Sequence, residues 1–361
     1  MNGCGRNDGT SAHPAVRLDF SRRSSGIPYD GWMEKALAYL SRTWAVPPDT
    51  VRLEPIHGGL ESRVMRGRVT GETSATGAPS SFVLKELRGA QRREVSIYRS
   101  IWSTLPSPPA AKLLGVHRGA DADYLFLEDV TPACNWPWRD HAEAAAVCRE
   151  LARLHDAPAL QLPAATWDYE AELLTSAAST LDLALTLRGP GGRRAWRRTT
   201  ELRRVVESLA AIRERLLAEE STVLHGDVHP GNVMVIEGGE GRRVALIDWA
   251  RARVGSPLED AASWLHSLGC WEPESRRRHD SLLQAYLAAR AVPRSLDRQV
   301  REDYWLASAC NGLSGAIRYN LAVVADPQSS ESARAQSRHA LNEWQRLIRG
   351  AALILRRRSA C

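Results

Sequence analysis

The spacing of hydrophobic and polar positions changes along the chain and divides it into two parts. In the first part, residues 30–45 carry apolar side chains at helical intervals, and residues 51–69 have the pattern of strand, glycine turn and strand. The pattern continues with a strand at 82–87, a helix at 90–102 and two short strands at 112–118 and 123–130. This order predicts a small sheet with one helix inserted after the third strand.

Helical periodicity dominates from residue 139 onward. Helices are predicted at 140–158, 169–187 and 199–220, and again through most of 258–356. Between them, residues 232–249 ("NVMVIEGGEGRRVALIDW") predict a hairpin with a glycine-rich turn. Strands first and helices afterwards predict an α+β chain whose two lobes enclose a cleft. We place a β-rich N-lobe at 30–130 and a larger helical C-lobe at 131–361, and expect a disordered tail at 1–29.

The composition agrees with a globular protein. Of the 361 residues, 43% are hydrophobic and 25% are charged, which is ordinary for this class. No apolar run approaches the roughly 20 residues of a membrane span, and the first thirty residues lack the apolar segment of a signal peptide. The six cysteines are scattered without a CxxC pair, which disfavours a zinc site or a disulfide framework. We therefore expect a cytoplasmic protein that does not bind membranes.

The charge pattern argues against a nucleic-acid partner, although the net charge is +6. The arginines are spread along the chain, they alternate with acidic residues, and no nucleic-acid-binding motif accompanies them. Lysine is rare, since Lys35, Lys85 and Lys112 are the only lysines among 48 basic residues. A lysine on an apolar strand is therefore worth attention.

The stretch "VLHGDVHPGNV" (223–233) concentrates more hydrogen-bonding side chains than a structural turn needs. Phosphoryl transfer requires a carboxylate that accepts the proton of an attacking hydroxyl, and oxygen ligands for magnesium. Asp227 suits the role of base, and Asn232 and Asp248 suit the roles of Mg²⁺ ligands, because the hairpin between them folds both toward one site. His225 and His229 are then supports that hold the loop in shape.

"HGDVHPGN" followed by "LIDW" resembles the catalytic and metal-binding motifs of the aminoglycoside phosphotransferase and choline kinase-like family. The resemblance covers roughly residues 50–270 and implies the two-lobed protein-kinase fold. It also implies ATP or GTP as phosphoryl donor, Mg²⁺, and a hydroxylated small molecule as acceptor. Trp249 stands where protein kinases have phenylalanine, and no APE-like activation segment follows. Both departures favour a small-molecule kinase.

The resemblance assigns further residues in the first part of the chain. Lys85 in "FVLK" would contact the α- and β-phosphates, and Glu94 would pair with this lysine. Glu86 is nearer in sequence, but it should point off the opposite face of its strand. Gly58 and Gly59 would permit close backbone approach to the phosphates, and Ser62 would donate to a phosphate oxygen.

Other residues are matched to the hinge and to the supports of the catalytic loop. Backbone groups of the segment from Glu128 to Val130 would meet the adenine. His155 in "ELARLH" is interpreted as structural rather than catalytic. Asp260 in "PLEDAASW" matches an acidic position that would anchor the catalytic loop rather than react.

The acceptor is predicted from the charge of a turn. Residues 188–204 form a basic turn that carries seven arginines and one acid, Glu201. An acceptor site for polycationic aminoglycosides should instead be lined with carboxylates. We therefore expect a neutral or partly anionic hydroxylated acceptor, such as an antibiotic or another secondary metabolite. The aromatic residues available to stack on it are Tyr304, Trp305, Tyr319 and Trp344.

Two alternatives stay open at this point. The chain could be a nucleotide-binding pseudokinase with a regulatory role, which the presence of all four charged catalytic positions disfavours. It could also phosphorylate a protein, which the missing activation segment disfavours. The choice between ATP and GTP and the oligomeric state are open as well.

Overall fold

The computed structural model describes the chain from residue 30 to residue 359 with several gaps. The described residues are 30–56, 63–70, 78–130, 132–133, 136–157, 162, 167–187, 195–238 and 241–359. The predictions for the tail at 1–29, and for Gly58, Gly59 and Ser62, fall outside the described residues.

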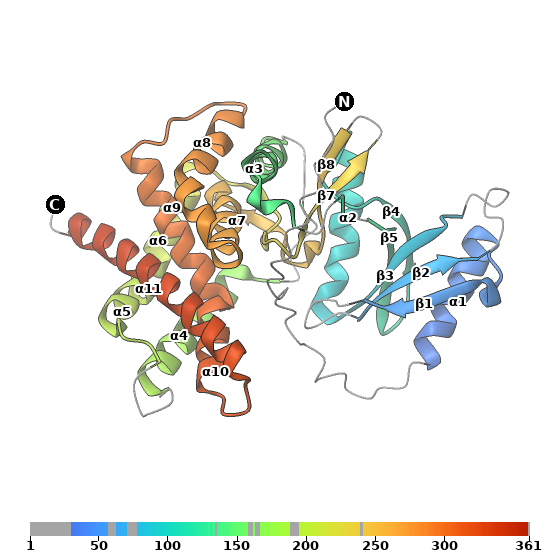
Figure 1. Cartoon of the computed structure of the whole chain (residues 1–361), viewed down its shortest axis with the longest axis horizontal. Helices are drawn as coiled ribbons and strands as arrows, with labels where there is room; N and C mark the ends of the chain where they lie inside the picture. Colours follow the sequence, from blue (N-terminus) through green and yellow to red (C-terminus); the bar gives the residue numbers. More distant parts are fainter. Residues whose placement is uncertain are drawn as a thin grey trace, which may run out of the picture.

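The first part of the chain is an antiparallel sheet in the order β1-β2-β3-β5-β4. Its strands are β1 (Val51–Pro55), β2 (Arg63–Val69), β3 (Ser81–Arg88), β4 (Leu113–Arg118) and β5 (Ala122–Glu128). Helix α2 (Arg93–Thr104) lies between β3 and β4 in the sequence, as the pattern predicts. Figure 1 shows this sheet with α1 and α2 at one end of the molecule and the later helices at the other.

The two faces of strand β3 serve different purposes because successive side chains point to opposite sides of a sheet. Phe82 and Leu84 pack in a cluster with α1 (Asp30–Trp44), which covers one face. Leu87 belongs to the larger core on the other face, and Lys85 points to that side. Glu86 pairs instead with Arg88, at 2.6 Å. The expected separation of Lys85 from Glu86 is therefore present.

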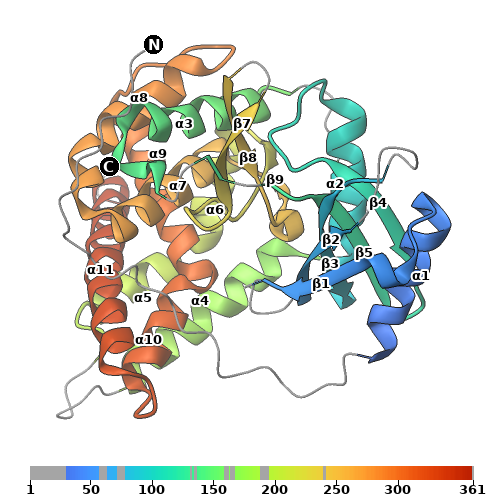
Figure 2. The same ribbon diagram turned by 45° about the vertical axis from the view of Figure 1, so that its right-hand side comes forward.

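The second part of the chain is mostly helical. Its helices are α3 (His141–His155), α4 (Tyr169–Thr186), α5 (Thr199–Glu207), α6 (Leu209–Glu219), α7 (Pro257–Trp271), α8 (His279–Ala289), α9 (Arg298–Asn311), α10 (Ile317–Ala325) and α11 (Glu331–Ser359). The later helices pack together, and Figure 2 shows α10 and α11 side by side. Every helix in the described ranges is too short or too polar to span a bilayer.

Two short sheets lie between the N-terminal sheet and the helices. The predicted hairpin is β7 (Val233–Gly238) paired with β8 (Gly241–Leu246). A second pair, β6 (Thr222–Leu224) with β9 (Arg253–Gly255), is too short to show in the sequence pattern. Together they hold both ends of the stretch that contains Asp227 and Asp248. Figure 1 shows β7 and β8 between the two parts of the molecule.

The prediction of one helix at 199–220 is wrong, because the helix is interrupted at Ser208, between α5 and α6. Ser208 has a φ of −94° and a ψ of 5°. The buried apolar positions nevertheless keep a helical spacing across the break, from Val205 to Leu209 and Ile212. Periodicity records which positions are buried, so it cannot detect a break that leaves the spacing intact.

Helix α9 continues into α10 through a π-helical turn, Gly312–Ala316. Gly315 lies outside the helical region, with a φ of 156° and a ψ of −30°. Such turns often occur at functional sites because they interrupt the regular helical hydrogen bonds. Residues of this turn line the same cavity as Asp227.

Candidate active site

Asp260 holds the loop that carries Asp227. Its carboxylate, in the first turn of α7, accepts hydrogen bonds from the backbone N–H groups of His225 (2.7 Å) and Gly226 (2.9 Å). Gly226 has a φ of 83°, and a Cβ there would lie 2.2 Å from the carbonyl oxygen of Arg251. The glycine of "HGD" is therefore a steric requirement of this loop.

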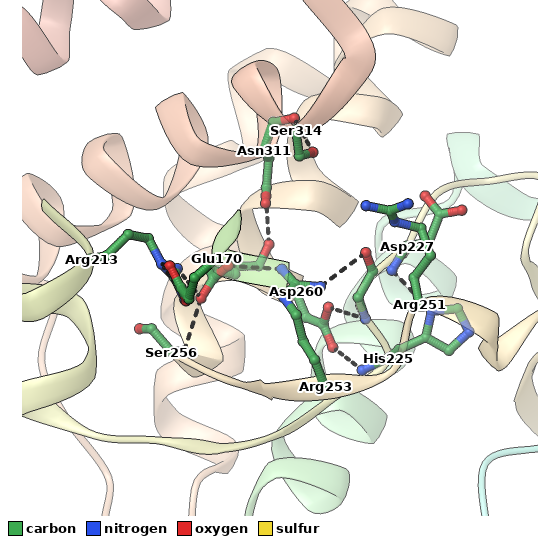
Figure 3. Close-up of polar contacts among 12 residues, drawn as sticks. Glu170, Arg213, His225, Asp227, Arg251, Arg253, Ser256, Asp260, Asn311 and Ser314 are labelled. Carbon is green, nitrogen blue, oxygen red and sulfur yellow. Dashed lines mark hydrogen bonds and ion pairs between the residues drawn. The ribbon is translucent and has the colours of Figure 1, made fainter. Parts of the chain in front are cut away.

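The two histidines of the loop bind backbone groups on either side of Asp227. His225 donates from Nε2 to the carbonyl of Ile247 at 3.0 Å, and its Nδ1 accepts from the Asp227 N–H at 3.3 Å. Burial lowers the pKa of His225, so the neutral ring that this arrangement requires is the stable form at neutral pH. His229 accepts from the Gly231 N–H at 3.0 Å. Figure 3 shows His225 beneath Asp227.

Asn232 connects Asp227 to the base of the hairpin. Its Nδ2 donates to the Asp227 carbonyl (3.0 Å) and to Asp227 Oδ2 (3.3 Å). The backbone carbonyl oxygen of Asn232 accepts a hydrogen bond from the Ile247 N–H at 2.9 Å. Asp248 directly follows Ile247. The two predicted metal ligands, Asn232 and Asp248, therefore lie close together at the open end of one hairpin. Because the amide nitrogen of Asn232 faces Asp227, the amide oxygen suits a cation.

Lys85 bridges two carboxylates from different parts of the molecule. Its Nζ lies 2.7 Å from Glu94 Oε2 and 2.8 Å from Asp248 Oδ1. Glu94 is fully buried in α2, and its Oε1 accepts from the backbone N–H of Trp249 at 3.1 Å. The N-terminal sheet, α2 and the end of the hairpin thus meet at one ammonium group.

The pKa values reflect this shared charge. Burial opposes the charge of Lys85, but Glu94 and Asp248 outweigh burial and raise its pKa. For Asp248, burial is likewise outweighed, chiefly by Lys85, and its pKa is lowered. Burial raises the pKa of Glu94 against the effect of Lys85. Asp248 also has a φ of 65° and a ψ of 68°, and such left-handed backbone is uncommon outside glycine and concentrates at functional sites.

The hinge segment is only partly available to a ligand. The N–H of Glu128 donates to the Lys112 carbonyl at 2.9 Å. The Glu128 side chain accepts from the Lys112 N–H (3.1 Å) and pairs with Arg243 (3.1 Å). The Glu128 N–H therefore serves the sheet, and a nucleotide base would have to use the backbone that follows it, toward Val130.

A cavity of about 530 Å³ lies beside Asp227. Its walls come from the loop that carries Asp227, from α7, from the π-helical turn with α10, and from α11. Of the aromatic residues considered for stacking, Tyr319 and Trp344 line it. Tyr304 is instead buried against His266, and Trp305 packs under Arg346, so these two belong to the helix packing.

The basic turn does not line this cavity with any of its described residues. Helix α5 packs against α4 and α11, and the Arg197 N–H donates to Gln345 of α11 at 3.0 Å. Arg198 pairs with Glu201 at 3.4 Å. The described part of the turn, residues 195–204, therefore lies outside the cavity wall and does not set the charge of the acceptor site. Of its arginines at described positions, Arg203 and Arg204 lie on α5, and Arg197 and Arg198 directly precede that helix.

A buried ion-pair network underlies the loop that carries Asp227. The fully buried Glu259 binds Arg213 at 2.7 Å and Arg253 at 2.8 Å. Arg253 also donates to the Gly226 carbonyl at 3.3 Å. The Glu259 carbonyl accepts from Asn311 at 2.7 Å, where α9 ends. Figure 3 shows Arg213 and Arg253 of this network near the loop of His225 and Asp227.

Glu259→Gln is expected to destabilise the fold by about 3–5 kcal/mol at pH 7, because two buried guanidinium groups lose their shared carboxylate. Denaturant unfolding measures this. Glu274→Gln is the matched control, since the pair of Glu274 with Arg277 is exposed. A loss no larger than that of the control would contradict the importance of the network.

The Glu259→Gln variant also tests how the unfolding free energy depends on pH. Burial opposes the charge of Glu259, but Arg253 and Arg213 outweigh it and lower its pKa below the ordinary 4.5. The stability that the carboxylate supplies is therefore present above its unfolded pKa and lost as the pH falls through its folded pKa. The difference in unfolding free energy between wild type and Glu259→Gln should shrink at acidic pH, below about 4.

Sequence reasoning missed several residues around the cavity. Trp271, Asn311 and Asn320 line it, and Arg251 stands beside Asp227. A signal was present for part of this wall: "NGLSGA" (311–316) places two glycines and a serine inside an otherwise helical pattern. Such a cluster indicates an interrupted helix. Trp271 and Arg251 carried no comparable signal.

Comparison with known proteins agrees with this geometry. The model of the phosphotransferase enzyme family matches residues 52–298. Among curated proteins, no sequence matches this chain. Among solved structures, an amicoumacin kinase in complex with AMP-PNP and Ca²⁺ is 14% identical with a TM-score of 0.59, and the match covers 88% of this chain and 94% of that one.

Two further structures have the same fold. A choline/ethanolamine kinase family protein from Mesorhizobium loti is 16% identical with a TM-score of 0.56, and the match covers 89% of this chain and 99% of that one. The aminoglycoside phosphotransferase APH(3'')-Id from Streptomyces rimosus, solved with ADP and streptomycin, is 18% identical with a TM-score of 0.51. That match covers 77% of this chain and 97% of the other. These likenesses confirm the predicted two-lobed kinase fold, and the family match identifies the chain as a member of the phosphotransferase enzyme family, a small-molecule kinase.

Proposed function

We propose that this protein transfers the γ-phosphoryl group of Mg-ATP or Mg-GTP to a hydroxyl of a small molecule. The observation that carries the proposal is Lys85, held at 2.7 Å from Glu94 and 2.8 Å from Asp248. The site lies beside the loop that presents Asp227 to a cavity. Phosphoryl transfer depends mainly on positioning and charge neutralisation, and this arrangement supplies both.

Asp248 and the amide oxygen of Asn232 would hold the magnesium ion. Within the described residues, no group of three or more His, Cys, Asp or Glu side chains could hold a metal by itself. Magnesium commonly binds one or two carboxylates and takes its other ligands from water and substrate phosphates. A two-residue protein site therefore suits a metal that arrives with a nucleotide. The bound ion would neutralise phosphate charge during transfer.

Lys85 would contact the nucleotide phosphates, and Glu94 would hold its ammonium group in place. Gly58, Gly59 and Ser62 would cover the phosphates, and the backbone toward Val130 would receive the base. The AMP-PNP and Ca²⁺ named for the amicoumacin kinase structure support the use of a nucleotide and a divalent metal.

Asp227 would accept the proton of the acceptor hydroxyl as its oxygen attacks the γ-phosphorus. Asn232 orients this carboxylate by binding its Oδ2 at 3.3 Å. Asp260, His225 and His229 act as supports, since they bind the backbone of the loop. Incubation with labelled ATP or GTP, Mg²⁺ and a panel of hydroxylated antibiotics and metabolites tests the proposal. Absence of Asp248-dependent nucleotide turnover under all conditions would refute it.

Lys85→Met is expected to lower turnover on the order of 10²-fold and to weaken nucleotide binding, because one charged donor to the phosphates is removed. Nucleotide titration and steady-state kinetics measure the two effects. Lys112→Met is the control, because Lys112 is an exposed lysine at the edge of the same sheet. Equal behaviour of the two variants would show that Lys85 does not contact the nucleotide.

A further inference from the structure

We propose that the cavity beside Asp227 accepts an uncharged molecule that carries several hydroxyl groups and a flat aromatic ring. This inference rests on the proposed function and names the class of its acceptor. It is drawn from the residues that line the cavity, and it does not depend on the basic turn.

The charges around the cavity are few and balanced. Among the described residues of its wall, Asp227 is the one carboxylate and Arg251 the one guanidinium. Arg251 is already compensated, because its Nη2 donates to Glu172 at 2.8 Å and its guanidinium lies 5.1 Å from the Trp167 ring. Figure 3 shows Arg251 next to Asp227. A polycation would need several carboxylates and an anion would need uncompensated cations, so neither fits this wall.

The polar side chains of the wall are suited to hydroxyl groups. Asn311 donates from Nδ2 to the Glu259 carbonyl at 2.7 Å, and Asn320 donates to the Ala316 carbonyl at 2.8 Å. These bonds orient both amides. Within the described part of the chain, neither amide oxygen has a partner. Amide oxygens accept hydrogen bonds from hydroxyl groups without requiring a charge, and Ser263, Ser267 and Ser314 add hydroxyls.

Aromatic side chains stand exposed at the same cavity. Trp271 on α7 is 40% exposed and Tyr319 on α10 is 47% exposed. Trp344 of α11 adds a third ring to the wall. Large apolar side chains that remain exposed around a concave site indicate ligand contact. Aromatic rings stack favourably on other flat rings, so an aromatic group on the acceptor would cover them.

The acceptor class is tested by calorimetric titration of the full chain in the presence of Mg-AMP-PNP. The probes are a set of 4-nitrophenyl glycosides, the corresponding methyl glycosides, and kanamycin. The expected order is tightest binding by a nitrophenyl glycoside, with its methyl counterpart and kanamycin about tenfold or more weaker. Equal binding of aryl and methyl glycosides, tightest binding by kanamycin, or binding by no probe would overturn the proposal.

Variants test whether residues of the cavity wall cause the preference for aryl glycosides. Tyr319→Leu should weaken binding of the nitrophenyl glycoside about 5-fold. Tyr319→Phe keeps the ring and should change this affinity little. Ala333 and Gln336 line the cavity on α11, and the double variant Ala333→Glu/Gln336→Glu adds two carboxylates. It should strengthen kanamycin binding by about 5-fold. An unchanged aryl preference in Tyr319→Leu, or no gain for kanamycin, would contradict the assignment.

A separate measurement distinguishes this proposal from the proposed function. Slow hydrolysis of ATP or GTP without acceptor, present in wild type and absent in Asp248→Ala, establishes the phosphoryl-transfer site alone. If that activity is present and kanamycin is the preferred acceptor, only the acceptor class is wrong. If that activity is absent, the proposed function fails as well.

Discussion

Asp248→Ala is expected to abolish phosphoryl transfer, with a loss on the order of 10³-fold or more. The substitution removes the carboxylate proposed to bind magnesium, and it also removes one of the two partners of Lys85. Lys85 would keep Glu94, at 2.7 Å, so the fold around the ammonium group should persist. Rates with labelled ATP or GTP over a range of Mg²⁺ concentrations measure the effect.

The control for this variant is Asp121→Ala, which removes an exposed carboxylate from a turn of the N-terminal sheet. It should leave turnover unchanged. Circular dichroism and thermal unfolding of both variants separate a loss of chemistry from a loss of folding. Ordinary turnover in folded Asp248→Ala would show that the metal site has been placed wrongly.

Asp227→Asn is expected to separate chemistry from binding. The substitution keeps the shape of the side chain but removes the proton acceptor, so phosphoryl transfer should fall by a factor on the order of 10² or more. Nucleotide affinity should survive, because the loop is held through its backbone by Asp260 and His225. Single-turnover kinetics give the transfer rate, and equilibrium titration gives the nucleotide dissociation constant.

Asp182→Asn, an exposed position on α4, is a suitable comparison for Asp227→Asn because it makes the same chemical change away from the site. The comparison variant should match wild type in both measurements. If Asp227→Asn instead lost nucleotide binding and kept its transfer rate, Asp227 would be a binding residue and not a base.

Much of the fold was predictable because it depends on local patterns. Short apolar runs bounded by turn residues predicted the strands of the N-terminal sheet, and helical spacing predicted the later helices. The hairpin between Asn232 and Asp248 brings these residues together through short-range pairing, in which Asn232 and Ile247 share a backbone hydrogen bond. Family resemblance, rather than periodicity, was needed to associate Lys85 with Glu94, and the helix break at Ser208 escaped both.

By itself, the sequence determined most of the elements and their order, and it predicted the roles of the residues around Asp227, since both depend on residues close together along the chain. Only the tertiary structure decided what surrounds the acceptor. Packing of α5 on α11 places the described residues of the basic turn, 195–204, away from the cavity. Packing of α10 on α11 brings Tyr319 and Trp344 to its wall. Glu259 meets Arg213 across 46 residues. Periodicity records which positions are buried but not which neighbours they meet, so contacts of this range appear only when the helices pack.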